Sequence, residues 1–263
     1  MESALAEMEF LALSANRVDV LRLLSESAHT RGKLAAETGA SQATLGRIIE
    51  DFEDRSWIRR EGGAYVATAT GRIVAEGVTD LLDILDTERD LRGIVRYLPS
   101  DAMDFDLRHL ADATITTPSQ TRPNAPLQRL LDLLRDAEDV RTFSHAFNDQ
   151  TLEIVRERVS AGEQTFRGVF SPHAIEALAA DDQLSGRLRR LLGEPDAAVR
   201  VRPAGVPLAV MVADDVVHLL LRDEDGVLRA ALETTNPEVR AWAERSFERY
   251  WADADPVSDA LSL

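Results

Sequence analysis

The chain has 263 residues, 44% of them hydrophobic, which is ordinary for a folded protein with a packed core. It contains no cysteine, which excludes disulfides, thiolate catalysis and zinc sites built on sulfur. Lys33 is the single lysine among the 30 basic residues, so lysine-dependent catalysis has no candidate in the C-terminal half. No stretch is apolar enough to cross a bilayer, and the first residues do not resemble a signal peptide, so we expect a cytoplasmic protein without a membrane partner.

The net charge of −16 is unevenly distributed. Residues 1–72 hold 11 acidic and 9 basic side chains, which leaves a balance of −14 for residues 73–263. Abundant Asp and Glu, with Arg in place of Lys, resemble cytoplasmic proteins of salt-accumulating archaea, whose carboxylates keep the surface hydrated. The alternative is an acidic protein of a GC-rich mesophile.

The first 60 residues carry the pattern of a helix-turn-helix. Apolar residues from Met8 to Leu24 recur at helical spacing and predict one helix or a broken pair. A short helix over 31–38, a turn at Gly39 and a longer helix from Gln42 to about Arg55 follow. Ser41 is suited to cap the second of these helices.

Two short strands, 57–60 and 64–67, flank the pair Gly62 and Gly63 and predict a β-wing. The shared core is predicted from Leu34, Leu45, Ile48, Ile49 and Phe52. The face of the second helix opposite this core, together with the wing, then supplies the candidate DNA-reading residues, which are Ser41, Gln42, Ala43, Thr44, Arg47, Arg59 and Arg60. The alternative is that the winged helix serves only to dock another protein.

From Gly71 through Tyr97 an apolar stripe predicts one long helix. The stripe consists of Val74, Val78, Leu81, Leu85, Leu91, Val95 and Leu98. A second copy of the chain would cover it and set two DNA-reading helices about one turn of DNA apart, so we expect a homodimer. The alternative is that the stripe packs on the chain's own C-terminal domain. The expected organisation is a DNA-binding domain over 1–70, a linker and dimerisation helix over 71–98, and a regulatory domain over 99–263.

Beyond Pro99 the pattern alternates between helices and strands and predicts an α/β domain with a mixed sheet. Helices are expected over 126–138, 151–160 and 174–192, with a last helix opening at Asn236, Pro237 and Glu238. Strands are expected over 140–144, 165–170, 199–202, 208–212, 216–221 and 228–232.

A proline-bearing loop, a strand ending in Ser-His, a strand ending in Phe-Ser-Pro and the late helix NPEVRAWAERSFERYW resemble the C-terminal domain of archaeal winged-helix regulators related to the methanogenesis and filamentation regulator of methanogens. That group is similar to the TrmB family of sugar-responsive regulators. The resemblance covers essentially the whole chain and implies a sensor domain similar to the phospholipase D fold without its catalysis. No histidine here has a lysine two residues away, as the phospholipase D signature requires.

Ligands of open α/β sheets bind beyond the carboxyl ends of the strands. The candidate effector-binding residues there are Ser144, His145, Asn148, Ser171 and His173, with the two histidines expected to face one pocket. The alternative is that these side chains cap the following helices. They lack the spacing of metal ligands, so we expect no metal, no cofactor and no catalytic residue. A hydrolase built on the Ser, His and Asp residues is a remote alternative, because no GxSxG elbow is present. The sequence thus predicts a transcriptional regulator that binds promoter DNA and an unidentified small-molecule effector.

Overall fold

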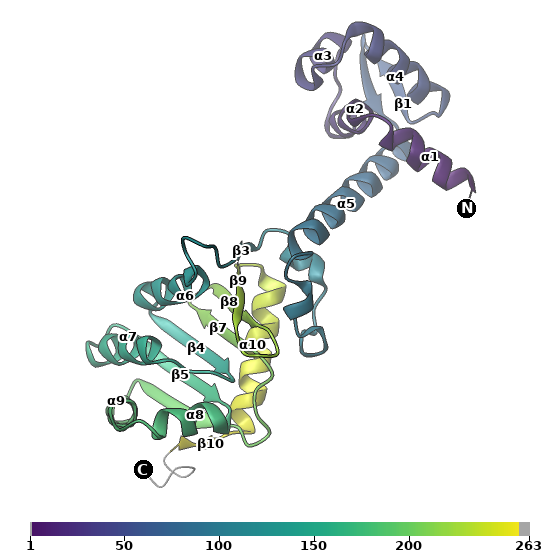
Figure 1. Cartoon of the computed structure of the whole chain (residues 1–263). Helices are drawn as coiled ribbons and strands as arrows, with labels where there is room; N and C mark the ends of the chain where they lie inside the picture. The colour runs from purple at the N-terminus through teal and green to yellow at the C-terminus, as the bar shows by residue number, and fades with distance from the viewer. Residues whose placement is uncertain (1, 258–263) are drawn as a thin grey trace. The chain divides into compact units, whose positions relative to one another are not determined.

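The computed structural model describes residues 2–257, and the chain divides after Asp86 into two compact units. The N-terminal unit contains the predicted winged helix-turn-helix (Figure 1). Its elements are α1 (Glu2–Ala12), α2 (Ala15–Glu26), α3 (Arg31–Thr38), α4 (Gln42–Asp54), β1 (Ile58–Glu61), β2 (Ala64–Ala67) and the first part of α5 (Ala69–Leu91). The broken pair of helices, the helix-turn-helix and the wing are all confirmed.

The N-terminal core forms where the sequence predicted it. Leu34, Leu45, Ile48, Ile49 and Phe52 are all buried. The ring of Phe52 lies 5.6 Å from that of Trp57 and 6.1 Å from that of Phe10, so an aromatic cluster joins α1, α4 and the start of the wing. Gly39 has a φ of 69°, which explains why a glycine stands at the turn before α4.

The helix predicted through Tyr97 is shorter than expected. α5 ends at Leu91, and a turn and a short 3₁₀ helix, η1 (Val95–Tyr97), follow it. The apolar stripe is divided, because Val74 and Val78 pack against the N-terminal core whereas Leu91 and Leu98 are buried in the C-terminal core. Between them Leu85 remains exposed, as does Val95 in η1.

The C-terminal unit is built on a mixed sheet of eight strands in the order β10-β6-β5-β4-β7-β8-β9-β3. The central strands β4, β5 and β6 are parallel, and every other pairing is antiparallel. The strands are β3 (Thr114–Thr116), β4 (Asp139–Ser144), β5 (Thr165–Phe170), β6 (Ala197–Val201), β7 (Ala209–Ala213), β8 (Val216–Arg222), β9 (Leu228–Thr234) and β10 (Asp255–Pro256). The predicted α/β class with a mixed sheet is confirmed, and the two edge strands β3 and β10 were not predicted.

Helices cover both faces of this sheet (Figure 1). One face packs against α6 (Ala125–Asp136), α7 (Asp149–Ser160), α8 (Pro172–Ala179) and α9 (Asp182–Leu192). The predicted helical region over 174–192 is therefore two helices, because the Asp181 carboxylate accepts hydrogen bonds from the N–H groups of Gln183 and Leu184 and starts a new helix there.

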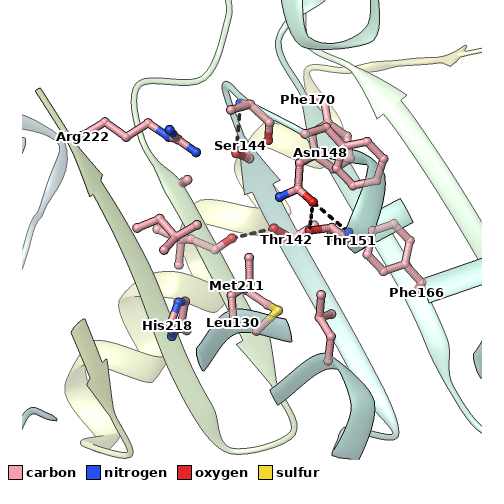
Figure 2. A pocket seen from close by; sticks show the side chains of 16 residues that line it. Leu130, Thr142, Ser144, Asn148, Thr151, Phe166, Phe170, Met211, His218 and Arg222 are labelled. Atoms are coloured by element: carbon pink, nitrogen blue, oxygen red, sulfur yellow. Dashed lines mark hydrogen bonds between the residues drawn. The ribbon is translucent and has the colours of Figure 1, made fainter. Parts of the chain in front are cut away.

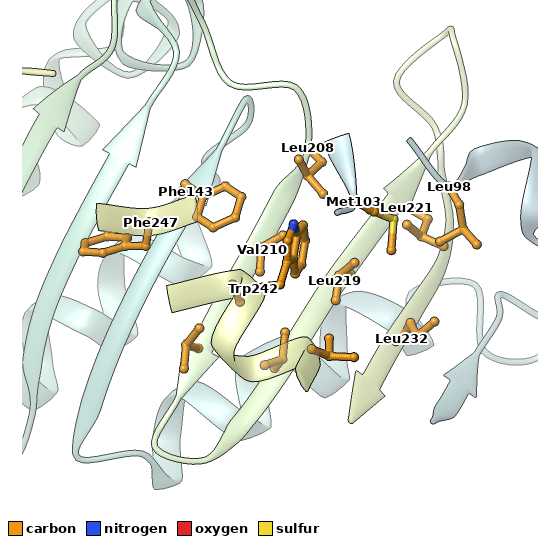
Figure 3. Packing of buried hydrophobic residues seen from close by; sticks show 14 of the residues in the cluster. Leu98, Met103, Phe143, Leu208, Val210, Leu219, Leu221, Leu232, Trp242 and Phe247 are labelled. Atoms are coloured by element: carbon orange, nitrogen blue, oxygen red, sulfur yellow. The ribbon is translucent and has the colours of Figure 1, made fainter. Parts of the chain in front are cut away.

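The other face packs against α10 (Pro237–Ala252) and the segment that contains η1, η2 (Ser100–Ala102) and η3 (Leu107–Leu110). Trp242 of α10 lies at the centre of this layer, against Val210 and Leu219 of the sheet (Figure 3). Its indole N–H donates to the carbonyl oxygen of Ala102 at 3.2 Å, so the only polar atom of the buried ring is satisfied.

Candidate functional site

The N-terminal half of α4 presents an exposed surface that carries no carboxylate. Gln42, Ala43 and Arg47 are exposed, while Leu45 and Ile48 face the core. The first acidic residue of α4 is Glu50, more than two turns from the start of the helix. The positive end of the helix dipole therefore coincides with the part of α4 that has no negative side chain, which favours contact with phosphates.

Ser41 and Thr44 fix the start of α4. The Ser41 hydroxyl accepts a hydrogen bond from the backbone N–H of Thr44 at 3.1 Å, and the two hydroxyl oxygens lie 2.9 Å apart. This is the geometry of an N-cap. Both residues thus have a structural role in addition to their predicted place at the DNA interface.

The three predicted arginines differ in their surroundings. Arg47 is exposed and makes no hydrogen bond or ion pair with any residue from 2 to 257. Arg59 pairs with Glu61 on the same strand at 2.5 Å, and the Arg60 guanidinium lies 5.9 Å from the centre of the Tyr65 ring. Because an exposed ion pair contributes only about 0–1 kcal/mol, Arg59 remains available to a phosphate.

Arg31 was not predicted from the sequence, but it belongs to the same surface. Its guanidinium donates a hydrogen bond to the carbonyl oxygen of Gln42, and it lies over Gly46, where a Cβ atom would approach Arg31 Nη2 to 2.9 Å. A glycine in a helix interior costs about 1 kcal/mol relative to alanine. Gly46 was the available signal, because a glycine inside a helix is unfavourable unless another group occupies the space of its side chain.

A second candidate site is a pocket in the C-terminal unit, between the sheet and the helices α6 and α7 (Figure 2). Its volume is about 70 Å³, several times the ~10–15 Å³ that one water molecule needs. The walls are mainly apolar. The apolar lining residues are Leu130, Leu134, Ala146, Phe147, Phe166, Phe170, Ala209, Val210, Met211 and Leu220. β4 and β5 are parallel, and β8 runs in the same direction because β4 and β8 are both antiparallel to β7. All three strands therefore end at this edge of the sheet, which is where ligands of α/β sheets bind.

Two of the five predicted effector-binding residues line this pocket. Ser144 ends β4, and its hydroxyl donates to the carbonyl oxygen of Ala146 at 2.6 Å. Asn148 caps α7, because its Oδ1 accepts hydrogen bonds from the N–H and the hydroxyl of Thr151 at 2.8 and 3.0 Å. Its amide nitrogen points into the pocket (Figure 2).

The other three predicted residues lie elsewhere. His145 is half-buried and lines a neighbouring cleft together with Arg222. Burial lowers the pKa of His145, and the positive charge of Arg222 lowers it further. Ser171 caps α8 and its hydroxyl also donates to the His145 carbonyl oxygen, whereas His173 is exposed on α8. The structure therefore brings Ser144, Asn148 and His145 to one edge of the sheet. His173 lines neither the pocket nor the neighbouring cleft.

His218 and Glu233 form a buried polar pair at the other end of the pocket. His218 is opposite Glu233 in the β8–β9 register, and its Nδ1 lies 3.4 Å from Oε1 of Glu233, too poorly aligned for a hydrogen bond. Arg129 of α6 donates from Nε to both oxygens of Glu233 at 2.8 and 2.9 Å. Burial raises the pKa of Glu233, but His218 and Arg129 lower it more, so the net shift is downward.

Arg222 and His218 also line the pocket but were not predicted from the sequence. Both lie on β8, and with Leu220 they occupy alternate positions that face the pocket. A histidine and an arginine at positions i and i+4 of an otherwise apolar strand were the available signal.

No described helix combines the length and apolar character needed to cross a membrane. Among residues 2–257 no group of three or more His, Asp or Glu side chains is arranged to hold a metal ion.

Two family models match the chain. Residues 123–253 match the middle domain of the methanogenesis regulatory protein FilR1, and residues 5–90 match the HVO_A0261 N-terminal domain. No curated protein sequence matches the chain significantly.

Several solved structures are similar to the chain. TrmBL2, an archaeal chromatin protein whose structure shows a novel mode of DNA binding, is 12% identical, with 92% of each chain covered and a TM-score of 0.44. NucT from Helicobacter pylori is 13% identical, over 55% of this chain and 98% of its own, with a TM-score of 0.43. Nuc from Salmonella typhimurium, a phospholipase D family member, is 10% identical, over 55% and 97%, with a TM-score of 0.42. At these identities none of the three indicates what this chain binds.

Proposed function

We propose that the chain, which matches the FilR1 middle domain over residues 123–253 and the HVO_A0261 N-terminal domain over residues 5–90, is an archaeal regulator that controls transcription by binding double-stranded promoter DNA. The observation that carries this proposal is the exposed half of α4, which combines a positive helix terminus, the unpaired Arg47 and the absence of carboxylates before Glu50. In a chain with a net charge of −16, such a surface is suited to a polyanion.

Base reading is assigned to the exposed side chains of α4. Gln42 and Arg47 have the hydrogen-bonding groups that read adenine and guanine edges in the major groove, and Ala43 offers an apolar contact to a thymine methyl group. Arg31, Arg59 and Arg60 then hold the phosphates on either side. In this assignment Ser41 and Thr44 chiefly orient α4, although their hydroxyls remain near the DNA.

We further propose that a small molecule in the pocket of the C-terminal unit regulates DNA binding. A ligand shifts DNA affinity only if it binds one state of the protein more tightly than the other, so the proposal requires a difference in affinity for the ligand between free and DNA-bound protein. The pocket supports the proposal because it lies at the carboxyl ends of three strands within the segment that matches the FilR1 middle domain. The role is allosteric and needs no catalytic residue.

The active species is proposed to be a homodimer in the cytoplasm of a salt-accumulating archaeon. Exposed apolar side chains on α1 and α5 support pairing, since an exposed apolar patch marks a surface that binds another protein. They are Leu5, Met8, Ile73, Leu82, Ile84 and Leu85. The acidic composition with one lysine supports the halophilic setting.

Genome-wide occupancy of the tagged chain tests the proposed function. We expect discrete promoter peaks that disappear in an Arg47→Ala, Arg59→Ala double variant and persist in Arg135→Ala, which alters an exposed arginine of α6 paired with Asp132. If no peaks rise above background at normal abundance, the winged helix docks a protein partner instead. Equal peaks in the double variant would contradict the assignment of α4 and the wing.

A further inference from the structure

We propose that the pocket beside α6 and α7 binds a small carboxylic acid with an apolar body. The proposal deepens the function above, because it rests on that function for the role of the acid as an effector. Three features carry it, namely the charge of the lining, the hydrogen-bond donors that have no partner, and the apolar walls.

The lining of the pocket has an unusual charge for this chain. The chain has 46 Asp and Glu residues, yet none of the 16 described residues that line the pocket is acidic. Arg222 is the only arginine or lysine among them. An anion that enters the pocket therefore meets a positive charge and no carboxylate from the lining.

Arg222 is half-buried and has no ion-pair partner among residues 2–257. Its Nη1 donates to the carbonyl oxygen of Gly226 at 2.8 Å, and its buried Nε has no hydrogen bond. The neighbouring carboxylate of Asp223 is held by Arg229 at 2.6 Å. Burial lowers the pKa of Arg222, which is the direction expected for a cation that lacks a counter-ion.

The other half-buried arginines of the C-terminal unit show what is missing at Arg222. Arg200 stacks over the Trp251 ring at 4.3 Å and donates to its carbonyl oxygen. The remaining ones are paired with carboxylates, in the pairs Arg141–Asp139, Arg156–Glu153, Arg158–Glu163, Arg167–Glu248, Arg187–Glu153, Arg202–Asp253 and Arg240–Glu244. A guanidinium fork matches a carboxylate with two parallel hydrogen bonds, so a ligand carboxylate would complete Arg222.

Further donors lie near the same end of the pocket. Oδ1 of Asn148 is engaged by Thr151, so the orientation of the amide is fixed and Nδ2 is left to point into the pocket (Figure 2). The pocket also borders the N-terminus of α7, whose dipole favours negative charge. Arg222 and Asn148 thus present donors from two sides of the pocket (Figure 2).

The rest of the pocket suits an apolar body. The rings of Phe166 and Phe170 form one wall, and Gly168 between them leaves room for the rings, since a Cβ there would lie 2.5 Å from the Phe170 ring. At the far end the buried His218 leaves Nε2 without a hydrogen-bond partner. The pocket therefore suits a ligand with a carboxylate at one end and an apolar middle. At the other end it can accommodate one hydroxyl or carbonyl group beside His218.

Calorimetric titration of the full chain, without DNA, tests the site. The probes are benzoate and 3-methylbutanoate, each compared with its uncharged amide. We expect both acids to bind and the amides to bind about 10–100-fold more weakly, because a hydrogen bond to a charged group is worth about 1.5–3 kcal/mol. Equal binding of acid and amide, or no binding of either acid at millimolar concentration, would overturn the proposal.

Two variants locate the binding. Arg222→Gln removes the charge, and Asn148→Asp keeps the helix cap while it replaces the amide donor with a negative charge. Both are expected to lose acid binding at least tenfold, whereas Arg135→Gln, outside the pocket, binds like the parent chain. Circular dichroism checks that each variant is folded. If a variant is unfolded, the comparison of acid with amide on the parent chain still tests whether the pocket binds the carboxylate.

A final measurement separates this inference from the proposed function. Promoter-fragment affinity is compared with and without the acid that binds best. If the acid binds but DNA affinity is unchanged, the proposed binding site is supported and the role of the acid as an effector is contradicted. If the chain binds promoter DNA but neither acid, the proposed regulatory function is supported and the proposed ligand class is wrong.

Discussion

The guanidinium of Arg31, at the start of α3, donates a hydrogen bond to the carbonyl oxygen of Gln42, at the start of α4. The contact holds a positive charge beside the first turn of the proposed recognition helix. Gly46, one turn further along α4, leaves the space that the guanidinium occupies. The two helices of the motif therefore share a cation that neither helix would position alone.

Gly46→Ala is expected to separate DNA binding from stability. The new Cβ would lie 2.9 Å from Arg31 Nη2, and the flexible arginine would move away at little cost. The free energy of unfolding should rise by up to about 1 kcal/mol, since alanine favours the helix. DNA affinity should fall, and the slope of log K against log salt should shrink by about one phosphate contact.

Fluorescence anisotropy with a promoter duplex over a range of salt concentrations measures this slope, and thermal denaturation measures the stability. Gly32→Ala is the matched control, because no atom lies within 4 Å of a Cβ at Gly32 in α3. An unchanged slope in Gly46→Ala would mean that Arg31 does not contact DNA.

Gly71→Ala is expected to destabilise the N-terminal unit. Gly71 lies in the first turn of α5, where its N–H donates to the Thr68 hydroxyl, and a Cβ there would lie 1.9 Å from the carbonyl oxygen of Trp57. Because that obstacle is backbone, the clash is relieved only by moving the wing against α5, at a cost of about 1–3 kcal/mol or more. Gly77→Ala in the same helix has open space and should stabilise by about 0.5–1 kcal/mol. Urea unfolding curves of both variants test the contrast, and equal effects would contradict it.

Elements with a local sequence signal were predicted well, whereas features that depend on tertiary contacts were not. Periodicity and cap residues are local signals, and they located the helix-turn-helix, the wing and most strands, including β5 at Thr165–Phe170. The end of α5 was missed because Leu91 and Leu98 continue the apolar stripe but are buried by the C-terminal sheet, a tertiary contact with no local signal. Two lining residues of the pocket were among the predicted residues, because Ser144 is the last residue of β4 and Asn148 follows that strand closely.

Arg222 and His218 were missed because their role depends on which strand pairs with which. Thr142 of β4 is opposite Met211 of β7, and Met211 is opposite His218 of β8, so this row of the lining is assembled across three strands. Strand order is not encoded in the alternation of any single strand. His173 has the same sequence signal as His145, yet α8 directs it to solvent.

Glu233 is expected to make stability depend on pH on the acid side. The pKa of its carboxyl is raised by burial but lowered more by His218 and Arg129, so it lies below the ordinary value of 4.5. A carboxylate with a lowered pKa in the folded state contributes stability that is present above its unfolded pKa and lost as the pH falls through the folded pKa. The difference in unfolding free energy between the parent chain and Glu233→Gln should therefore be largest above pH 4.5 and shrink below it.

Urea unfolding at a series of pH values measures this difference. Glu224→Gln, in the exposed turn between β8 and β9, is the control and should run parallel to the parent chain. A difference between the parent chain and Glu233→Gln that stays constant from neutral pH to well below 4.5 would show that Glu233 acts through packing rather than charge.

The homodimer is tested at the exposed apolar face of α5. Leu82 and Leu85 are 43% and 51% exposed and lie three positions apart, hence on the same face of the helix. If a second copy covers them, a Leu82→Glu, Leu85→Glu variant buries charge at the interface and should be monomeric by light scattering at concentrations where the parent chain is dimeric. Val227→Glu, at a comparably exposed position in the β8–β9 turn, should leave the mass unchanged. A monomeric parent chain would reject the dimer, and a dimeric double variant would move the interface away from this face of α5.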